Sequence, residues 1–200
     1  MDLATRYEGL SKLKGVKSFK VSGGNEWAFY ANGMGLVMCW PGFPTHFVSK
    51  RDSKGSPAQY DKPSGNGVIY GRLNRFQRHE LNLSMGQYFM PLCQEVRRFV
   101  TLSDKTSYQI LLEVGVPKNW DRVARSKKTG KVSWKPPAPD YKPTWDLDNW
   151  FFVHKNIQDA LVKWSIIRDD TIDQFPQCNR SYKEVADLND RYLLLAIKPI

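Results

Sequence analysis

Alternating or continuous apolar residues predict three strands in this chain. In the segment 107–116 apolar side chains occupy every second position, with Leu111 making the other face partly apolar, as in a sheet covered on both sides. The apolar run 36–40 ends at Pro41–Gly42, which predicts a strand followed by a turn. A second apolar run, within 191–200, is short enough to be an interior strand.

A three- and four-residue spacing of apolar side chains predicts a helix over roughly 75–100. The residues on its apolar stripe are Leu81, Met85, Phe89, Leu92, Val96 and Phe99. Gly86 and Pro91 interrupt this stripe, so we expect a kink or a division into two helices.

The same spacing predicts a second helix, which Asp148 or Asn149 can cap and which ends near 166–167. Its apolar stripe is formed by Trp150, Val153, Ile157, Leu161 and Trp164. The opposite face then carries Lys155 and Asp159. After this helix, the segment 168–172 is expected to begin another strand.

The order strand, helix, strand, helix, strand predicts an α+β domain with a mixed β-sheet packed against helices. We expect this domain to span residues 36–200. Residues 1–35 are expected to be an N-terminal extension of strands and turns whose role the sequence does not indicate. The segments 43–71 and 117–144 are rich in turn-forming and charged residues and are expected to be long loops.

The charge of the chain favours a polyanionic partner. Its 200 residues carry a formal net charge of +10, and its isoelectric point is about 9.5. The three cysteines show neither metal-ligand nor disulfide spacing, which favours a reducing compartment. With no apolar signal region behind Met1 and no run long enough to span a bilayer, we expect a cytoplasmic protein without a membrane partner.

The segment 117–144 is strongly basic and contains Trp120, Trp134 and Tyr141 among its charges. Basic side chains neutralise phosphates, and aromatic rings can stack on exposed bases. The candidate nucleic-acid-binding residues are Lys118, Arg122, Arg125, Lys127, Lys128, Lys131, Lys135 and Lys142. The alternative is that the segment is only a solvated loop. The position of the segment directly before an acidic motif favours nucleic-acid binding.

That motif is Asp146-Leu147-Asp148-Asn149. On an extended backbone, Asp146 and Asp148 project from the same face, because side chains alternate along a strand. The pair Asp169–Asp170 follows the predicted helix and can supply a third carboxylate. Carboxylate oxygens are ligands that Mg²⁺ prefers, and Mg²⁺ usually shares substrate phosphates with them. This combination indicates cleavage of a phosphodiester.

The motif order resembles the RusA family of Holliday junction resolvases. The residues that carry the resemblance are Asp146–Asn149, Lys155, Asp159–Leu161 and Asp169–Asp170. The resemblance covers residues 107–200 well and residues 36–100 in outline. It implies a RusA-like fold with Asp146, Asp148 and Asp170 as ligands of Mg²⁺, or of Mn²⁺ as a substitute, and with Lys155 required for cleavage.

The same resemblance implies an endodeoxyribonuclease that resolves Holliday junctions or other branched DNA by paired nicks. Such enzymes act as homodimers on four-way junctions in a bacterial or phage-infected cell. Lys155 departs from the family pattern, because it stands seven residues after Asp148 instead of four. Both spacings return to nearly the same helix face, about one turn or roughly 5 Å apart. His154 can substitute for the lysine or serve only in packing.

Each motif also has a structural interpretation without catalysis. Asp148 or Asn149 can be only a helix cap, Lys155 and Asp159 only an ion pair, and Asp169–Asp170 only a turn. The leading alternative is therefore a non-catalytic branched-DNA-binding protein that retains the resolvase fold. A third is an RNA- or ribosome-associated module that uses only the basic segment.

Overall fold

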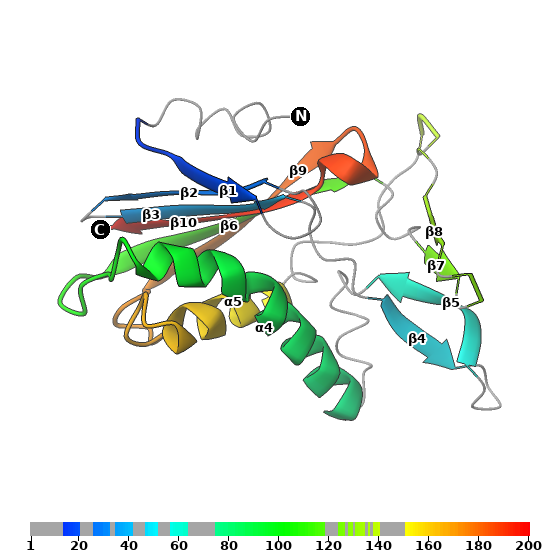
Figure 1. Ribbon diagram of the computed structural model, residues 1–200, viewed down its shortest axis with the longest axis horizontal. Coiled ribbons are helices and arrows are strands. Elements are labelled where there is room, and N and C mark those ends of the chain that lie inside the picture. Colours follow the sequence, from blue (N-terminus) through cyan, green and yellow to red (C-terminus); the bar gives the residue numbers. More distant parts are fainter. Residues whose placement is uncertain are drawn as a thin grey trace.

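The computed structural model shows an α+β fold, as the element pattern predicts. Figure 1 shows a large sheet with two helices packed against one of its faces, and a second, smaller sheet. The residues that the structure describes are 14–20, 26–32, 35–41, 47–51, 57–63, 75–118, 124–126, 128–129, 131–134, 136, 138–140 and 151–200.

The large sheet has six strands in the order β1-β2-β3-β10-β6-β9. Their bounds are β1 Lys17–Lys20, β2 Glu26–Asn32, β3 Gly35–Pro41, β10 Tyr192–Pro199, β6 Tyr108–Pro117 and β9 Gln177–Val185. Only β6 and β9 are parallel, so the sheet is mixed. The strands predicted at 36–40, 107–116 and 191–200 are confirmed as β3, β6 and β10, and β10 is an interior strand between β3 and β6.

Strands from both sides of the predicted boundary at residue 36 belong to the same sheet. β2 pairs with β3 from Ala28 opposite Cys39 to Asn32 opposite Gly35. Trp27 and Phe29 of β2 are buried in the main core. The described part of the segment 1–35 therefore forms β1 and β2, the two strands at one edge of the sheet.

The smaller sheet lies in segments expected to be loops, so that expectation is wrong for these residues. It contains β4 Phe47–Arg51, β5 Pro57–Pro63, β7 Ala124–Ser126 and β8 Val132–Ser133, in that order. Tyr60 of β5 stands opposite Ser126 of β7, far away in the sequence. Because strands so far apart in the sequence supply each other's backbone hydrogen bonds, the composition of either segment alone does not predict them.

The first predicted helix is α4, Arg75–Arg97, and it is one helix that continues through Gly86 and Pro91. The predicted division into two helices therefore does not occur. Its stripe is buried from Leu81 to Val96, because these side chains pack against the large sheet. Phe99 is 52% exposed, since it lies beyond the helix end.

The second predicted helix is α5, Phe151–Lys163, with Val153, Ile157 and Leu161 buried. It ends before the predicted 166–167 because Ser165 adopts a left-handed conformation with φ of 55°. The amide of Ser165 donates to the carbonyl of Val162 at 2.9 Å, and the amide of Ile166 to that of Leu161 at 3.0 Å. This is the Schellman arrangement that terminates many helices.

The two faces of the large sheet have different cores. One face packs against α4 and α5 through large side chains that include Trp40, Tyr108 and Phe89. The other face carries a smaller buried cluster around Cys39, Tyr192 and Leu194. Neither described helix is long and apolar enough to cross a membrane.

Candidate functional site

The unit β6–α5–β9 contains all the motif residues that the sequence nominates for chemistry. β6 and β9 are parallel neighbours, with Gln109 opposite Gln177 and Pro117 opposite Val185. α5 lies between them in the sequence. The Asp146–Asn149 motif comes between β6 and α5, and Asp169–Asp170 between α5 and β9. The two acidic motifs therefore flank one crossover helix.

Part of the nominated set lies outside the described residues. This applies to the metal-ligand candidates Asp146 and Asp148, and to Asn149 and Trp150. Among the basic candidates, it applies to Arg122, Lys127, Lys135 and Lys142. Arg125 lies in β7, and its side chain is outside the described set.

The basic candidates that the structure describes lie in two places, after β6 and between β7 and β8. Lys118 directly follows the last residue of β6. Lys128 and Lys131 are exposed in the connection between β7 and β8, where the amide of Ser126 donates to the carbonyl of Lys131 at 3.0 Å. This hairpin therefore presents two cations to solvent.

Lys155 lies on the solvent-facing side of α5. Its Nζ is 3.0 Å from Oδ1 of Asp159, one helical turn further along. The side chains are 57% and 56% exposed, so water screens the pair. The structure thus contains the ion pair that the non-catalytic interpretation predicts for these two residues.

Asp169 and Asp170 lie in a turn, and the prediction that they begin a strand is wrong. β9 begins at Gln177, and Ile172 between them is 78% exposed. Oδ1 of Asp169 accepts from the amide of Asp170 at 2.8 Å, and the amide of Phe175 donates to the carbonyl of Thr171 at 2.9 Å. Such local hydrogen bonds compete with strand pairing, which explains the turn.

This turn packs against the chain that enters β6. Arg168 forms an ion pair with Asp104 at 2.8 Å, and the hydroxyl of Ser107 donates to the carbonyl of Asp173 at 3.0 Å. The amide of Tyr108 donates to the carbonyl of Gln174 at 2.7 Å. These contacts place the turn at the amino-terminal ends of β6 and β9.

Asp170 follows the carboxy-terminal end of α5, in the segment that packs against the chain entering β6. A helix of 13 residues is about 20 Å long at 1.5 Å per residue. The structure therefore does not bring Asp170 to the first turns of α5, where Lys155 lies. Among the residues that the structure describes, no group of three or more His, Cys, Asp or Glu side chains can hold a metal ion.

His154 is buried, with 3% of its surface exposed. Burial, together with the positive charge of Arg180 on β9, lowers the pKa of this imidazole to about 4. The side chain is therefore neutral near pH 7. Its Nε2 is buried and has no hydrogen-bond partner in the described part of the chain. Its position agrees with packing and not with replacement of a surface lysine.

The residues that surround Asp169 could not be predicted from the sequence. Asp104 and Arg168 are 64 positions apart, yet they form an ion pair beside it. Oε1 of Gln174 accepts from the amide of Asp169 at 3.2 Å. The only local signal is the density of Asp, Thr and Gln after α5, which is typical of any surface turn.

No protein-family model matches this chain, and no curated protein is similar to it. The function is therefore inferred from the residues of the chain itself.

Proposed function

We propose that this chain is a Mg²⁺-dependent, structure-specific endodeoxyribonuclease that nicks four-way junctions or other branched DNA. The observation that carries the proposal is the order of motifs in the unit β6–α5–β9. An acidic motif precedes α5, Lys155 and Asp159–Leu161 lie on it, and Asp169–Asp170 follow it. This is the order that the resemblance to RusA-family resolvases implies, and the helix that it requires is present.

In this proposal Asp146, Asp148 and Asp170 hold Mg²⁺, or Mn²⁺ in its place. The carboxylate of Asp170 makes no hydrogen bond or ion pair with any described residue, so it is available to a ligand. A bound divalent ion supplies activation of water and stabilises charge on the leaving oxygen.

A single site for all three carboxylates sets a strict geometric condition. Asp146 stands five positions before Phe151, the first residue of α5, and an extended chain of that length spans at most roughly 17 Å. That reach is close to the length of α5, about 20 Å for its 13 residues. A shared site therefore requires the acidic segment to run back alongside the helix toward the turn 168–174.

The basic residues supply binding to the DNA backbone. Lys118 follows β6, and the β7–β8 hairpin exposes Lys128 and Lys131. Each cation that neutralises a phosphate releases counterions, which makes binding favourable and dependent on salt. Lys155 contacts the scissile phosphate after leaving Asp159, because an exposed ion pair of this kind contributes only about 0.3–0.5 kcal/mol.

The proposal includes a homodimer, since a four-way junction has two-fold symmetry and its resolution needs two coordinated nicks. It also assigns the protein to the cytoplasm of a bacterial or phage-infected cell, where branched DNA arises.

Two observations favour a second candidate, a branched-DNA-binding protein without cleavage. Lys155 is paired with Asp159, and the described structure does not bring Asp170 to the first turns of α5. In this alternative the basic residues bind DNA and the acidic residues have only structural roles.

One experiment separates the candidates. The purified chain is incubated with a synthetic four-way junction and with a linear duplex of the same sequences, with Mg²⁺, with Mn²⁺ and with a chelator. Binding is measured in parallel by fluorescence anisotropy. The nuclease proposal predicts metal-dependent nicks in the junction and little cleavage of the duplex. Preferential binding of the junction without nicks in either metal would favour the second candidate.

A further inference from the structure

β9 forms one edge of the large sheet, and its outer side pairs with no described strand. The strand is nine residues long and contains no proline. It pairs with β6 from Gln177 to Val185 without a register shift, and its side chains are exposed or half-buried. A straight edge strand of this length presents a row of backbone N–H and C=O groups that can pair with a strand of another chain.

The opposite edge of the sheet is formed by β1, which is poorly suited to such pairing. β1 has only four residues, with Lys17 at its start and Lys20 at its end. Short edge strands and lysines are common means by which proteins prevent pairing at a sheet edge. β9 is more than twice as long, and its charged residues are of both signs. Of the two edges, β9 is therefore the one that favours a partner strand.

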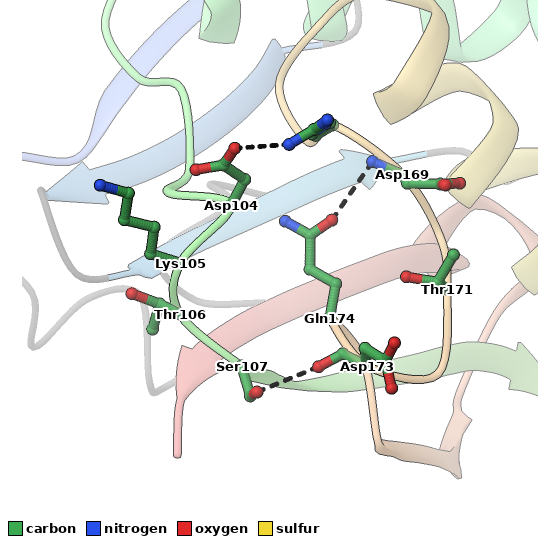
Figure 2. Close-up of a pocket in the computed structure, with 9 residues that line it drawn as sticks. Asp104, Lys105, Thr106, Ser107, Asp169, Thr171, Asp173 and Gln174 are labelled. Atoms are coloured by element: carbon green, nitrogen blue, oxygen red, sulfur yellow. Dashed lines mark hydrogen bonds and ion pairs between the residues drawn. The ribbon is translucent and has the colours of Figure 1, made fainter.

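The chain on either side of β9 packs toward β6. Figure 2 shows the turn 168–174 against the segment 104–107, where the hydroxyl of Ser107 donates to the carbonyl of Asp173. After β9, the short helix η3, Leu188–Asp190, contacts β6. These contacts draw both described segments toward the inner neighbour of β9 and away from its outer edge.

The charges of β9 complement a second copy of the same strand. Arg180 and Glu184 lie on the same face of the sheet, on either side of Tyr182, because side chains alternate along a strand. They are about 13 Å apart along the strand, so they are not neighbours within one copy. Antiparallel pairing about a two-fold axis at Tyr182 places Arg180 of each copy opposite Glu184 of the other. Registers centred on Arg180 or Lys183 place like charges opposite each other, and one centred on Ser181 forms no ion pair.

We propose that two copies of this chain associate by antiparallel pairing of their β9 strands about Tyr182, which joins the two six-stranded sheets into one. Such an interface is the same on both copies and covers the β9 edge of each, so assembly stops at the dimer. This inference assigns a surface to the homodimer of the proposed function. The pairing itself requires neither DNA nor a metal ion, so either proposal can fail without the other.

The first test is sedimentation of the full chain over a series of concentrations, without DNA and in a chelator. We expect a dimer. Glu184→Arg places cations opposite each other at two positions, so it should raise the dimer Kd by about tenfold or more. Arg180→Glu should act in the same direction, and the variant with both exchanges should recover the affinity of the parent. Gln87→Arg, which adds a cation to the exposed face of α4, should not change the Kd.

The exposed Cys178 allows a second test of the register. In the proposed pairing it stands opposite Ala186 of the other copy. Opposed residues of antiparallel strands have Cα atoms roughly 4.5–5.5 Å apart, which permits a disulfide. Within one copy the two positions are about 26 Å apart along the chain. Ala186→Cys should therefore give a covalent dimer with diamide, which accepts the two electrons and two protons of each pair of thiols.

The matched control combines Ala186→Cys with Cys178→Ser and should remain uncrosslinked, because the other two cysteines are buried. A monomer at every concentration would overturn the proposal and would mean that Arg180 and Lys183 protect the edge. A dimer that is unaffected by Glu184→Arg, or that Ala186→Cys does not crosslink, would place the interface elsewhere and also overturn it. A crosslinked dimer that nicks no junction would support β9 pairing and contradict only the nuclease proposal.

Discussion

The hydroxyl of Tyr192 donates a hydrogen bond of 2.6 Å to Oε1 of Glu113, across the pairing of β10 with β6. To reach it, the ring of Tyr192 lies over Gly115, the residue directly opposite it in the register. β6 belongs to the unit β6–α5–β9 that contains the candidate site, and β10 is its neighbour in the sheet. The absence of a side chain at position 115 is therefore a condition of this packing.

Gly115→Ala should destabilise the protein. A Cβ at this position would overlap the Tyr192 ring, and overpacking of this kind typically costs about 1–3 kcal/mol. The matched control is Gly86→Ala, because a Cβ there meets nothing within 4 Å and lies inside α4. Alanine in a helix is favoured over glycine by roughly 0.5–1 kcal/mol. Urea unfolding should show opposite signs for the two variants, and equal effects would contradict this packing.

Ser165→Gly should stabilise the protein by about 0.5–1 kcal/mol. Ser165 occupies the left-handed position that terminates α5, where glycine has no steric penalty. The control Ser165→Ala retains a Cβ and should give no gain. The measurement is the midpoint of thermal or urea unfolding. A Gly variant no more stable than the Ala variant would show that the turn is not strained by a side chain.

Burial of His154 should make stability depend on pH in the acid range. The folded-state pKa is about 4, below the ordinary value of 6.5, so between these values the unfolded chain binds a proton that the folded chain does not. The free energy of unfolding is therefore unaffected by this histidine above pH 6.5. It decreases by on the order of 3 kcal/mol as the pH falls from 6.5 toward 4.

His154→Gln removes this titration and should flatten the pH dependence in that window. His79→Gln is the control, because His79 is exposed on α4. The free energy of unfolding is measured by urea titration at several pH values. If the parent and His154→Gln lose stability in parallel, the assigned origin of the shift is wrong.

Lys155 tests whether the surface of α5 takes part in cleavage. If it contacts the scissile phosphate, Lys155→Ala should lower the single-turnover rate by orders of magnitude and change junction affinity little. Lys155→Arg should restore little activity, because a planar guanidinium does not replace a compact ammonium.

Asp159→Asn is the matched control for the ion pair. It releases Lys155 without removing it, so its cleavage rate should equal or exceed that of the parent. Each variant should lose at most about 0.5 kcal/mol of stability from the exposed pair. Equal rates for the parent and Lys155→Ala would show that Lys155 takes no part in cleavage.

The elements that depend on local periodicity were predictable from the sequence. In β6 every second side chain from Tyr108 to Val114 is buried, as the two-residue spacing predicts. In α5 the side chains of Val153, Ile157 and Leu161 are buried, as the three- to four-residue spacing predicts. β5 and β7 were not predictable, because Tyr60 and Ser126 are paired through the fold and neither segment has an apolar pattern. The strand predicted for 168–172 does not form, since Asp169 accepts a hydrogen bond from the next backbone amide.

The candidate site was predictable only as a set of residue types in order. The motif order correctly placed a helix between the two acidic segments. It did not reveal that the turn around Asp170 packs against the chain entering β6, because this packing depends on contacts of Arg168 and Asp173 with residues about 60 positions earlier.

The central claim is that Asp148 and Asp170 serve one metal-dependent cleavage reaction. The most direct measurement is single-turnover nicking of a four-way junction in Mg²⁺ by the parent, Asp148→Asn, Asp170→Asn and the exposed control Asp140→Asn, with junction affinity measured in a chelator. The proposal predicts that the first two variants lose nicking and bind the junction as tightly as the parent or more tightly, since each loses a negative charge. Asp140→Asn should cleave normally. Cleavage near the parent rate by Asp170→Asn would contradict the claim and would leave the turn after α5 outside the active site.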